Sequence, residues 1–86
     1  MMTSRTPVDY SALTIEDVVR RMSPGQKDAL VAIKAGDLDW EDLVARLRES
    51  LVHKGLVSRS GEVTPRGRSA ARMVSVDRAA NWEKYL

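Results

Sequence analysis

The sequence predicts one small, mainly α-helical domain that carries a single short β-hairpin. Three observations lead to this fold class: the helix-start signal at residues 23–26, an apolar stripe at helical spacing over residues 40–51, and two β-prone runs flanking Ser60-Gly61. The length of 86 residues suits one domain and is too short for two. Apolar residues make up 43% of the chain and charged residues 30%, which is typical of a globular domain.

Two helices are expected before residue 37. Thr14 is placed to cap a helix over residues 14–22, whose apolar residues recur at helical spacing: Ile15, Val18, Val19 and Met22. Ser23 and Gln26 have the spacing of a capping box, and Pro24 suits the first helical position because its missing N–H is not needed there. The second helix should therefore run over residues 24–35 and end at Gly36.

A third helix is predicted from Asp39, which would cap it, to Lys54, with Gly55 ending it. Its apolar residues follow the i, i+3, i+4, i+7, i+11 pattern: Trp40, Leu43, Val44, Leu47 and Leu51. This stripe is interpreted as a core-facing surface, and a seam for a partner helix is the alternative.

The hairpin is predicted from residues 56–59 and 62–64, which are β-prone and flank a two-residue turn. Thr64-Pro65 then opens a fourth helix, which either continues to Trp82 and Tyr85 or breaks near Val76-Asp77. The expected organisation is a flexible arm over residues 1–12, a domain over residues 13–76 and a C-terminal helical extension over residues 77–86.

Several function classes lack the residues that they require. The chain has no cysteine and a single histidine, His53, so neither a disulfide framework nor a metal site is expected, and no cofactor is predicted. No apolar run is long enough to span a membrane, and the first ten residues show no signal-peptide pattern, so a cytoplasmic protein without membrane contact is expected. Ser50, His53 and Glu49 are neighbours on the predicted helix but lack the pocket and oxyanion site of a nucleophilic enzyme, so no enzyme is predicted.

Positive charge is concentrated in one segment. The acidic and basic side chains of residues 1–38 cancel, and those of residues 39–53 sum to −2. Residues 54–78 carry six lysines and arginines against Glu62 and Asp77, which gives +4. Arginine suits phosphate because its planar guanidinium donates two parallel hydrogen bonds to the phosphate oxygens.

The order of the elements and two short segments resemble winged helix-turn-helix proteins. The third helix ends in HKGLVSR (residues 53–59), and VTPRGR (residues 63–68) follows the hairpin. The abundance of Ala, Val and Arg is also similar to that of small proteins of actinobacteria and their phages. The resemblance covers about residues 14–75 and implies a winged-helix-like three-helix core plus a C-terminal helix.

The resemblance implies a DNA-binding transcriptional regulator that contacts double-stranded DNA with its third helix and its hairpin. The candidate contacts that it implies are Arg46, Arg48, Lys54, Arg59, Arg66 and Arg68. Two features depart from the family pattern: the hairpin is very short, and acidic residues (Asp39, Glu41 and Asp42) begin the third helix, where they would oppose docking on DNA.

Two alternatives remain open at this stage. The fold could serve as a protein-interaction module without DNA binding, or the chain could be an enzyme inhibitor or an assembly subunit. Trp82, Tyr85 and Leu86 are candidates for a homodimer or partner interface, because aromatic side chains are favoured at interfaces. They could equally pack back onto Tyr10 and the first helix.

Overall fold

The computed structural model describes residues 9–82, with the side-chain surroundings of residues 9–80. This part of the chain consists of helical segments joined by short links. In chain order these are η1 (Tyr10–Ala12, a 3-10 turn), α1 (Ile15–Arg21), α2 (Pro24–Ala35), η2 (Trp40–Asp42, a 3-10 turn), α3 (Ala45–His53) and α4 (Pro65–Trp82). The prediction of a mainly helical chain is confirmed.

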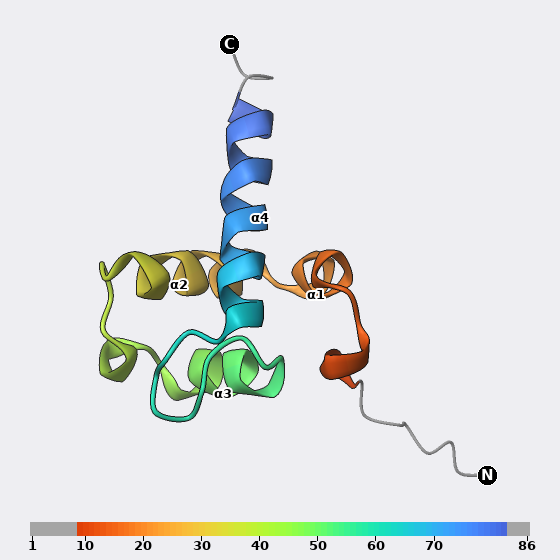
Figure 1. Cartoon of the computed structure of the whole chain (residues 1–86). Coiled ribbons are helices and arrows are strands. Elements are labelled where there is room, and N and C mark those ends of the chain that lie inside the picture. The colour runs from red at the N-terminus through yellow and green to blue at the C-terminus, as the bar shows by residue number, and fades with distance from the viewer. Residues whose placement is uncertain (1–8, 83–86) are drawn as a thin grey trace, which may run out of the picture.

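Helix α4 is the element around which the others are arranged. Its first half packs against α1 and α2, and α2 in turn packs against α3 (Figure 1). The second half of α4 extends away from the other helices. Of the predicted arm over residues 1–12, the described part forms η1, and residues 1–8 lie outside the described chain.

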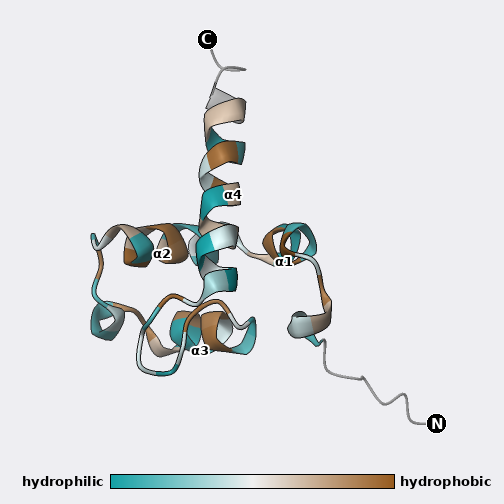
Figure 2. Cartoon of the chain, in the orientation of Figure 1, coloured by the Kyte–Doolittle hydropathy of each residue, from teal (hydrophilic) through white to brown (hydrophobic). Residues whose placement is uncertain are grey.

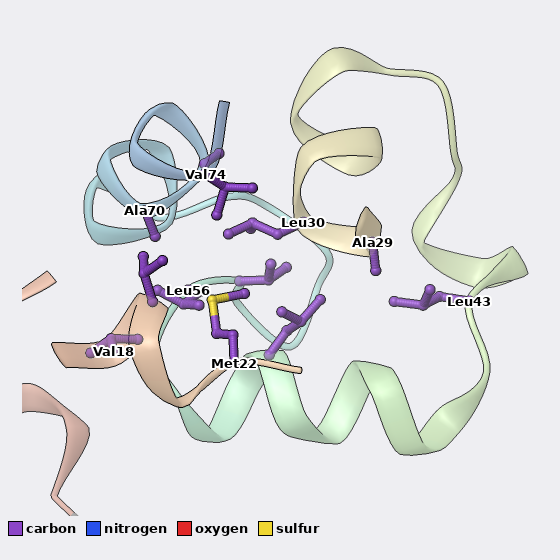
Figure 3. Packing of buried hydrophobic residues seen from close by; sticks show 12 residues of the cluster. Val18, Met22, Ala29, Leu30, Leu43, Leu56, Ala70 and Val74 are labelled. Carbon is purple, nitrogen blue, oxygen red and sulfur yellow. The ribbon is translucent and has the colours of Figure 1, made fainter. Parts of the chain in front are cut away.

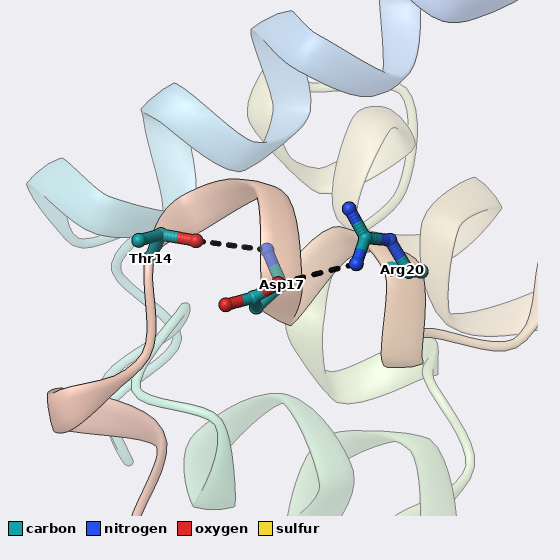
Figure 4. A network of polar contacts seen from close by, with 3 residues as sticks. All are labelled: Thr14, Asp17 and Arg20. Carbon is teal, nitrogen blue, oxygen red and sulfur yellow. Dashed lines mark hydrogen bonds and ion pairs between the residues drawn. The ribbon is translucent and has the colours of Figure 1, made fainter.

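The helix starts follow the local signals of the sequence. Thr14 Oγ1 accepts a hydrogen bond from the backbone N–H of Asp17, which also pairs with Arg20 one turn later (Figure 4). Ser23 and Gln26 form the predicted capping box, with both hydrogen bonds at 3.2 Å. Gly36 ends α2 at φ 80°, as predicted for a left-handed C-terminal residue.

The prediction of one long third helix is wrong. Residues 40–42 form the separate turn η2, the backbone at Leu43 and Val44 is extended, and α3 begins only at Ala45. Asp39 does not cap it with its side chain. Trp40 lies against the turn at Gly61, where an added Cβ would come within 2.6 Å of Trp40 Cγ. The spacing of apolar residues does not reveal this contact with a distant segment. Val44, which the predicted stripe placed on the buried face of the helix, is 61% exposed.

The predicted β-hairpin is also not supported, because no strand forms in residues 9–82. A single antiparallel bridge joins Val57 to Val63. The N–H of Gly61 donates to the carbonyl of Ser58, so residues 58 and 59, the end of the first predicted strand, belong to the turn. Thr64 caps α4, accepting from the N–H of Gly67 and donating to the carbonyl of Gly55, so the second run ends in a helix start. Too few residue pairs remain for a ladder.

The core lies where α1, α2, α3 and α4 meet. Side chains from all four helices and from the link after α3 converge there (Figure 3). Leu30, Leu51 and Leu56 are fully buried. The N–H of Leu56 donates to the carbonyl of Leu51 after the left-handed Gly55, so the end of α3 places a second leucine in the core.

Helix α4 continues past Val76 without a break and reaches Trp82. Residues 75–80 are exposed and mix hydrophobic with hydrophilic side chains (Figure 2). One ion pair, between Arg78 and Asp28 of α2, connects this part of α4 to the domain. None of the helices described is both long and apolar enough to cross a membrane.

Candidate nucleic-acid interface

The six cationic residues predicted to contact DNA do not form one cluster. Arg46, Arg59 and Arg68 are exposed, and Arg48 is half-buried. The remaining two, Lys54 and Arg66, are turned toward the interior. The structure therefore separates the predicted set into a surface group and an internal group.

Arg66 connects the start of α4 to the N-terminal segment. Its Nη2 donates to the carbonyl oxygens of Tyr10 at 2.8 Å and Leu13 at 2.7 Å. Its Nε is buried and has no hydrogen-bond partner among the described residues. These contacts use the guanidinium within the fold, so Arg66 has a structural role that the charge pattern did not reveal.

Lys54, at the end of α3, is 7% exposed. Its Nζ lies 5.0 Å from the centre of the Tyr10 ring, and His53 packs edge-on against the same ring at 5.3 Å. A cation over an aromatic face gains about 0.5–2 kcal/mol, and the negative end of a helix adds about 0.3–1 kcal/mol. The Lys54 ammonium has no ion-pair partner among the described carboxylates.

Arg48 and Arg59 come together although they belong to different segments. Both line a hollow of about 230 Å³, together with Trp40, Ala45, Glu49 and Val52. No described carboxylate, Glu49 included, lies within 4.0 Å of either guanidinium. The side chains of this hollow sum to a charge of +1, with two arginines against one glutamate.

A second hollow, of about 350 Å³, borders the same turn. Lys34 and Arg68 line it with Glu62, so it also sums to +1. Lys34 was not among the predicted contacts. Its position in the last turn of α2 offered no sign that the turn at 58–62 would lie beside it.

The displaced start of α3 changes the electrostatics of this surface. The exposed acidic residues predicted to begin the helix lie instead in and just before η2, and the first turn of α3 carries no carboxylate. No side chain caps α3, so backbone N–H groups at Ala45 and Arg46 are open to an external acceptor. Helix starts of this kind favour anions.

A further hollow, of about 460 Å³, is lined by Val19 and Met73 together with two acidic and two basic side chains, so its charges cancel: Glu16, Asp77, Arg20 and Lys27. The described residues hold no group of three side chains suited to a metal. The predicted interface residues Trp82, Tyr85 and Leu86 stay untested: the side chain of Trp82 and residues 83–86 lie outside the described part of the chain.

Asp9 precedes η1 and lines a hollow together with Tyr10 and Lys54. The hydroxyl and the backbone N–H of Ser11 donate to its carboxylate and hold the pKa of Asp9 below its ordinary value. Asp9 is thereby committed to its own turn and forms no ion pair with the neighbouring cations that the structure describes.

Comparisons of the chain with protein-family models, curated proteins and solved structures found no match. The resemblance to winged helix-turn-helix proteins therefore stays a prediction.

Proposed function

We propose that this chain binds double-stranded DNA through phosphate contacts from the surface formed by the start of α3 and the turn at 58–62. The observation that carries the proposal is the arrangement at Ala45. There α3 begins uncapped and without acidic residues, next to arginines from two segments that have no ion-pair partner in the described chain. Phosphate oxygens can accept from both kinds of donor.

The proposed contacts are a smaller set than the sequence predicted. Arg48 and Arg59 flank Trp40 in one hollow, Arg68 and Lys34 line the other, and Arg46 is exposed on the first turn of α3. Phosphate contacts position a protein on DNA without reading its sequence. The short turn at 58–62 is a small contact surface, consistent with binding that is weak per domain and strongly dependent on salt.

Fluorescence anisotropy with a labelled duplex of random sequence tests this proposal. If each of the five proposed cations neutralises one phosphate, the slope of log K against log salt should be about −4.5, which is roughly a 500-fold loss of affinity between 50 and 200 mM salt. Replacing Arg48 and Arg59 together by glutamine should make the slope shallower by about 2.

The matched control is the double variant Arg21→Gln and Arg72→Gln, which removes the same charge from exposed positions on α1 and α4. Its slope should stay within about 0.5 of that of the parent chain. An equal loss of slope in both double variants, or no binding at 50 mM salt, would contradict the proposed surface.

A protein-interaction role is the second candidate, and the observation that favours it is the exposure of residues 75–80 in α4. Residues 75–80 are all exposed, with Val76 at 60%. If α4 forms a homodimer, light scattering should give twice the monomer mass for the full chain and the monomer mass for a chain ending at Asp77. A monomer mass for both would exclude this homodimer.

A further inference from the structure

The hollow between η1, the end of α3 and the start of α4 has no role in the proposed DNA contact. Its volume is about 300 Å³, and the side chains of Asp9, Tyr10, Ser11, His53, Lys54 and Arg66 line it. Three separate segments contribute to it. It faces the N-terminal segment, whereas the DNA surface proposed above borders the turn at 58–62.

The hollow contains more positive than negative charge, and its cations lack counter-ions. Lys54 is the one charged side chain with less than a tenth of its surface exposed in the described chain, and its ammonium makes no ion pair or hydrogen bond there. Arg66 lies beside it with a buried Nε that has no acceptor. Asp9, the single carboxylate of the hollow, is held by Ser11.

A buried donor without an acceptor, the Nε of Arg66, lies beside a largely buried lysine without a counter-ion, and this favours a ligand that supplies negative charge. Buried charges in proteins are paired, and buried donors are hydrogen-bonded. The ring of Tyr10 and the end of α3 favour the positive charge of Lys54, but neither provides an acceptor for the Nε of Arg66.

We propose that this hollow binds a phosphate group between Lys54 and Arg66, with His53 at its rim. A tetrahedral oxyanion offers several acceptor oxygens in different directions and can therefore be shared by donors from separate segments. Charge-assisted hydrogen bonds from lysine and arginine are the strong contacts of such sites. The bound phosphate would join the N-terminal segment to α3 and α4.

Thermal unfolding with inorganic phosphate tests the site, using sodium chloride at the same ionic strength as the reference. Phosphate at ten times its Kd should favour the folded state about elevenfold. For a chain of this length that corresponds to a rise in Tm of roughly 5–10 °C. The rise should saturate with phosphate concentration.

Lys54→Met removes the ammonium, keeps a side chain of similar length and should abolish the phosphate-dependent rise. Arg72→Met, at an exposed position of α4 outside both proposed surfaces, is the matched control and should keep it. If Lys54→Met does not fold, Lys54→Arg is measured in its place. This variant keeps a positive charge at the site and should retain the phosphate-dependent rise in Tm. A parent chain whose Tm responds equally to phosphate and chloride, or a saturable rise that persists in Lys54→Met, would overturn the site.

Free phosphate compounds and the DNA backbone share this chemistry, and the duplex titration separates them. For a free phosphate ligand, Lys54→Met should bind the duplex as tightly as Arg72→Met, which removes one exposed charge outside both proposed surfaces. A selective loss of duplex affinity in Lys54→Met, together with the phosphate-dependent rise in the parent, would instead assign the site to a backbone phosphate. Because Arg48 and Arg59 are outside this hollow, failure of either proposal leaves the other measurable.

Discussion

Replacing Arg66 by methionine should destabilise the fold, although Arg66 was first predicted as a DNA contact. Its Nη2 donates to two backbone carbonyls, at 2.8 and 2.7 Å, in the segment before α1. Methionine preserves most of the aliphatic contacts and removes both donors. The carbonyls of Tyr10 and Leu13 would then lose their partner in a partly buried place.

The magnitude follows from the two hydrogen bonds and one opposing effect. A hydrogen bond that involves a charged group contributes about 1.5–3 kcal/mol net. The two share a single nitrogen, and the substitution also removes the buried Nε that has no acceptor, which returns about 1 kcal/mol or more. We expect a loss of about 2–3 kcal/mol in the free energy of unfolding, or a fall in Tm of roughly 8–20 °C for a chain of this length.

Urea and thermal unfolding followed by circular dichroism measure this loss. Arg68→Met is the matched control, because Arg68 lies on the same helix, is exposed, and its side chain makes no hydrogen bond within the described chain. Its stability should change by less than about 0.5 kcal/mol. A change below 0.5 kcal/mol for Arg66→Met, or equal losses for both variants, would refute the structural role of Arg66.

Two further predictions concern single positions. A Cβ at Gly67 would lie 1.9 Å from the carbonyl oxygen of Leu56. Gly67→Ala should therefore lower the free energy of unfolding by about 2–3 kcal/mol in urea titrations. At Gly25 the nearest atom is 4.0 Å away, so Gly25→Ala should not destabilise the fold by more than about 0.5 kcal/mol. Equal effects at the two glycines would contradict this close approach. Because Ser11 holds the pKa of Asp9 below its ordinary value, Asp9 stabilises the fold above its unfolded pKa and this contribution is lost as pH falls through the folded pKa. Ser11→Ala should raise the pKa of Asp9 in an NMR titration, and an unchanged pKa would show that Ser11 is not the cause.

The helix boundaries set by local chemistry could be predicted from the sequence. The capping box of Ser23 and Gln26, the cap at Thr14 and the left-handed Gly36 each depend on contacts within about one helical turn. Such signals are complete in a short stretch of chain, and all three were confirmed.

The errors arose where distant contacts decide the local conformation. Trp40 packs against Gly61, and the helix expected from residue 39 is interrupted before Ala45. The helix start at Thr64 was predicted, but the bond from Thr64 to the carbonyl of Gly55, nine residues earlier, was not. Neither contact is visible in hydrophobic spacing or residue propensity.

The sequence indicated which type of residue to examine, but it did not show which of the six predicted cations are exposed. Arginines in the segment after α3 were correctly singled out as exposed at Arg59 and Arg68, whereas Arg66 and Lys54 bind within the fold. A count of charges along the sequence gives +1 to an exposed cation and to a cation that binds within the fold. Only burial and hydrogen-bond partners distinguish a cation that can reach phosphate on DNA from one that holds two segments together.

The central claim is that DNA is held by the start of α3 and the turn at 58–62, and an NMR titration of the ¹⁵N-labelled chain with a random duplex at 50 mM salt tests it most directly. We predict that amide shift changes concentrate at residues 45–48 and 58–62, while residues 75–80 of α4 stay unchanged. Shift changes confined to α4, or none at this salt concentration, would contradict the account.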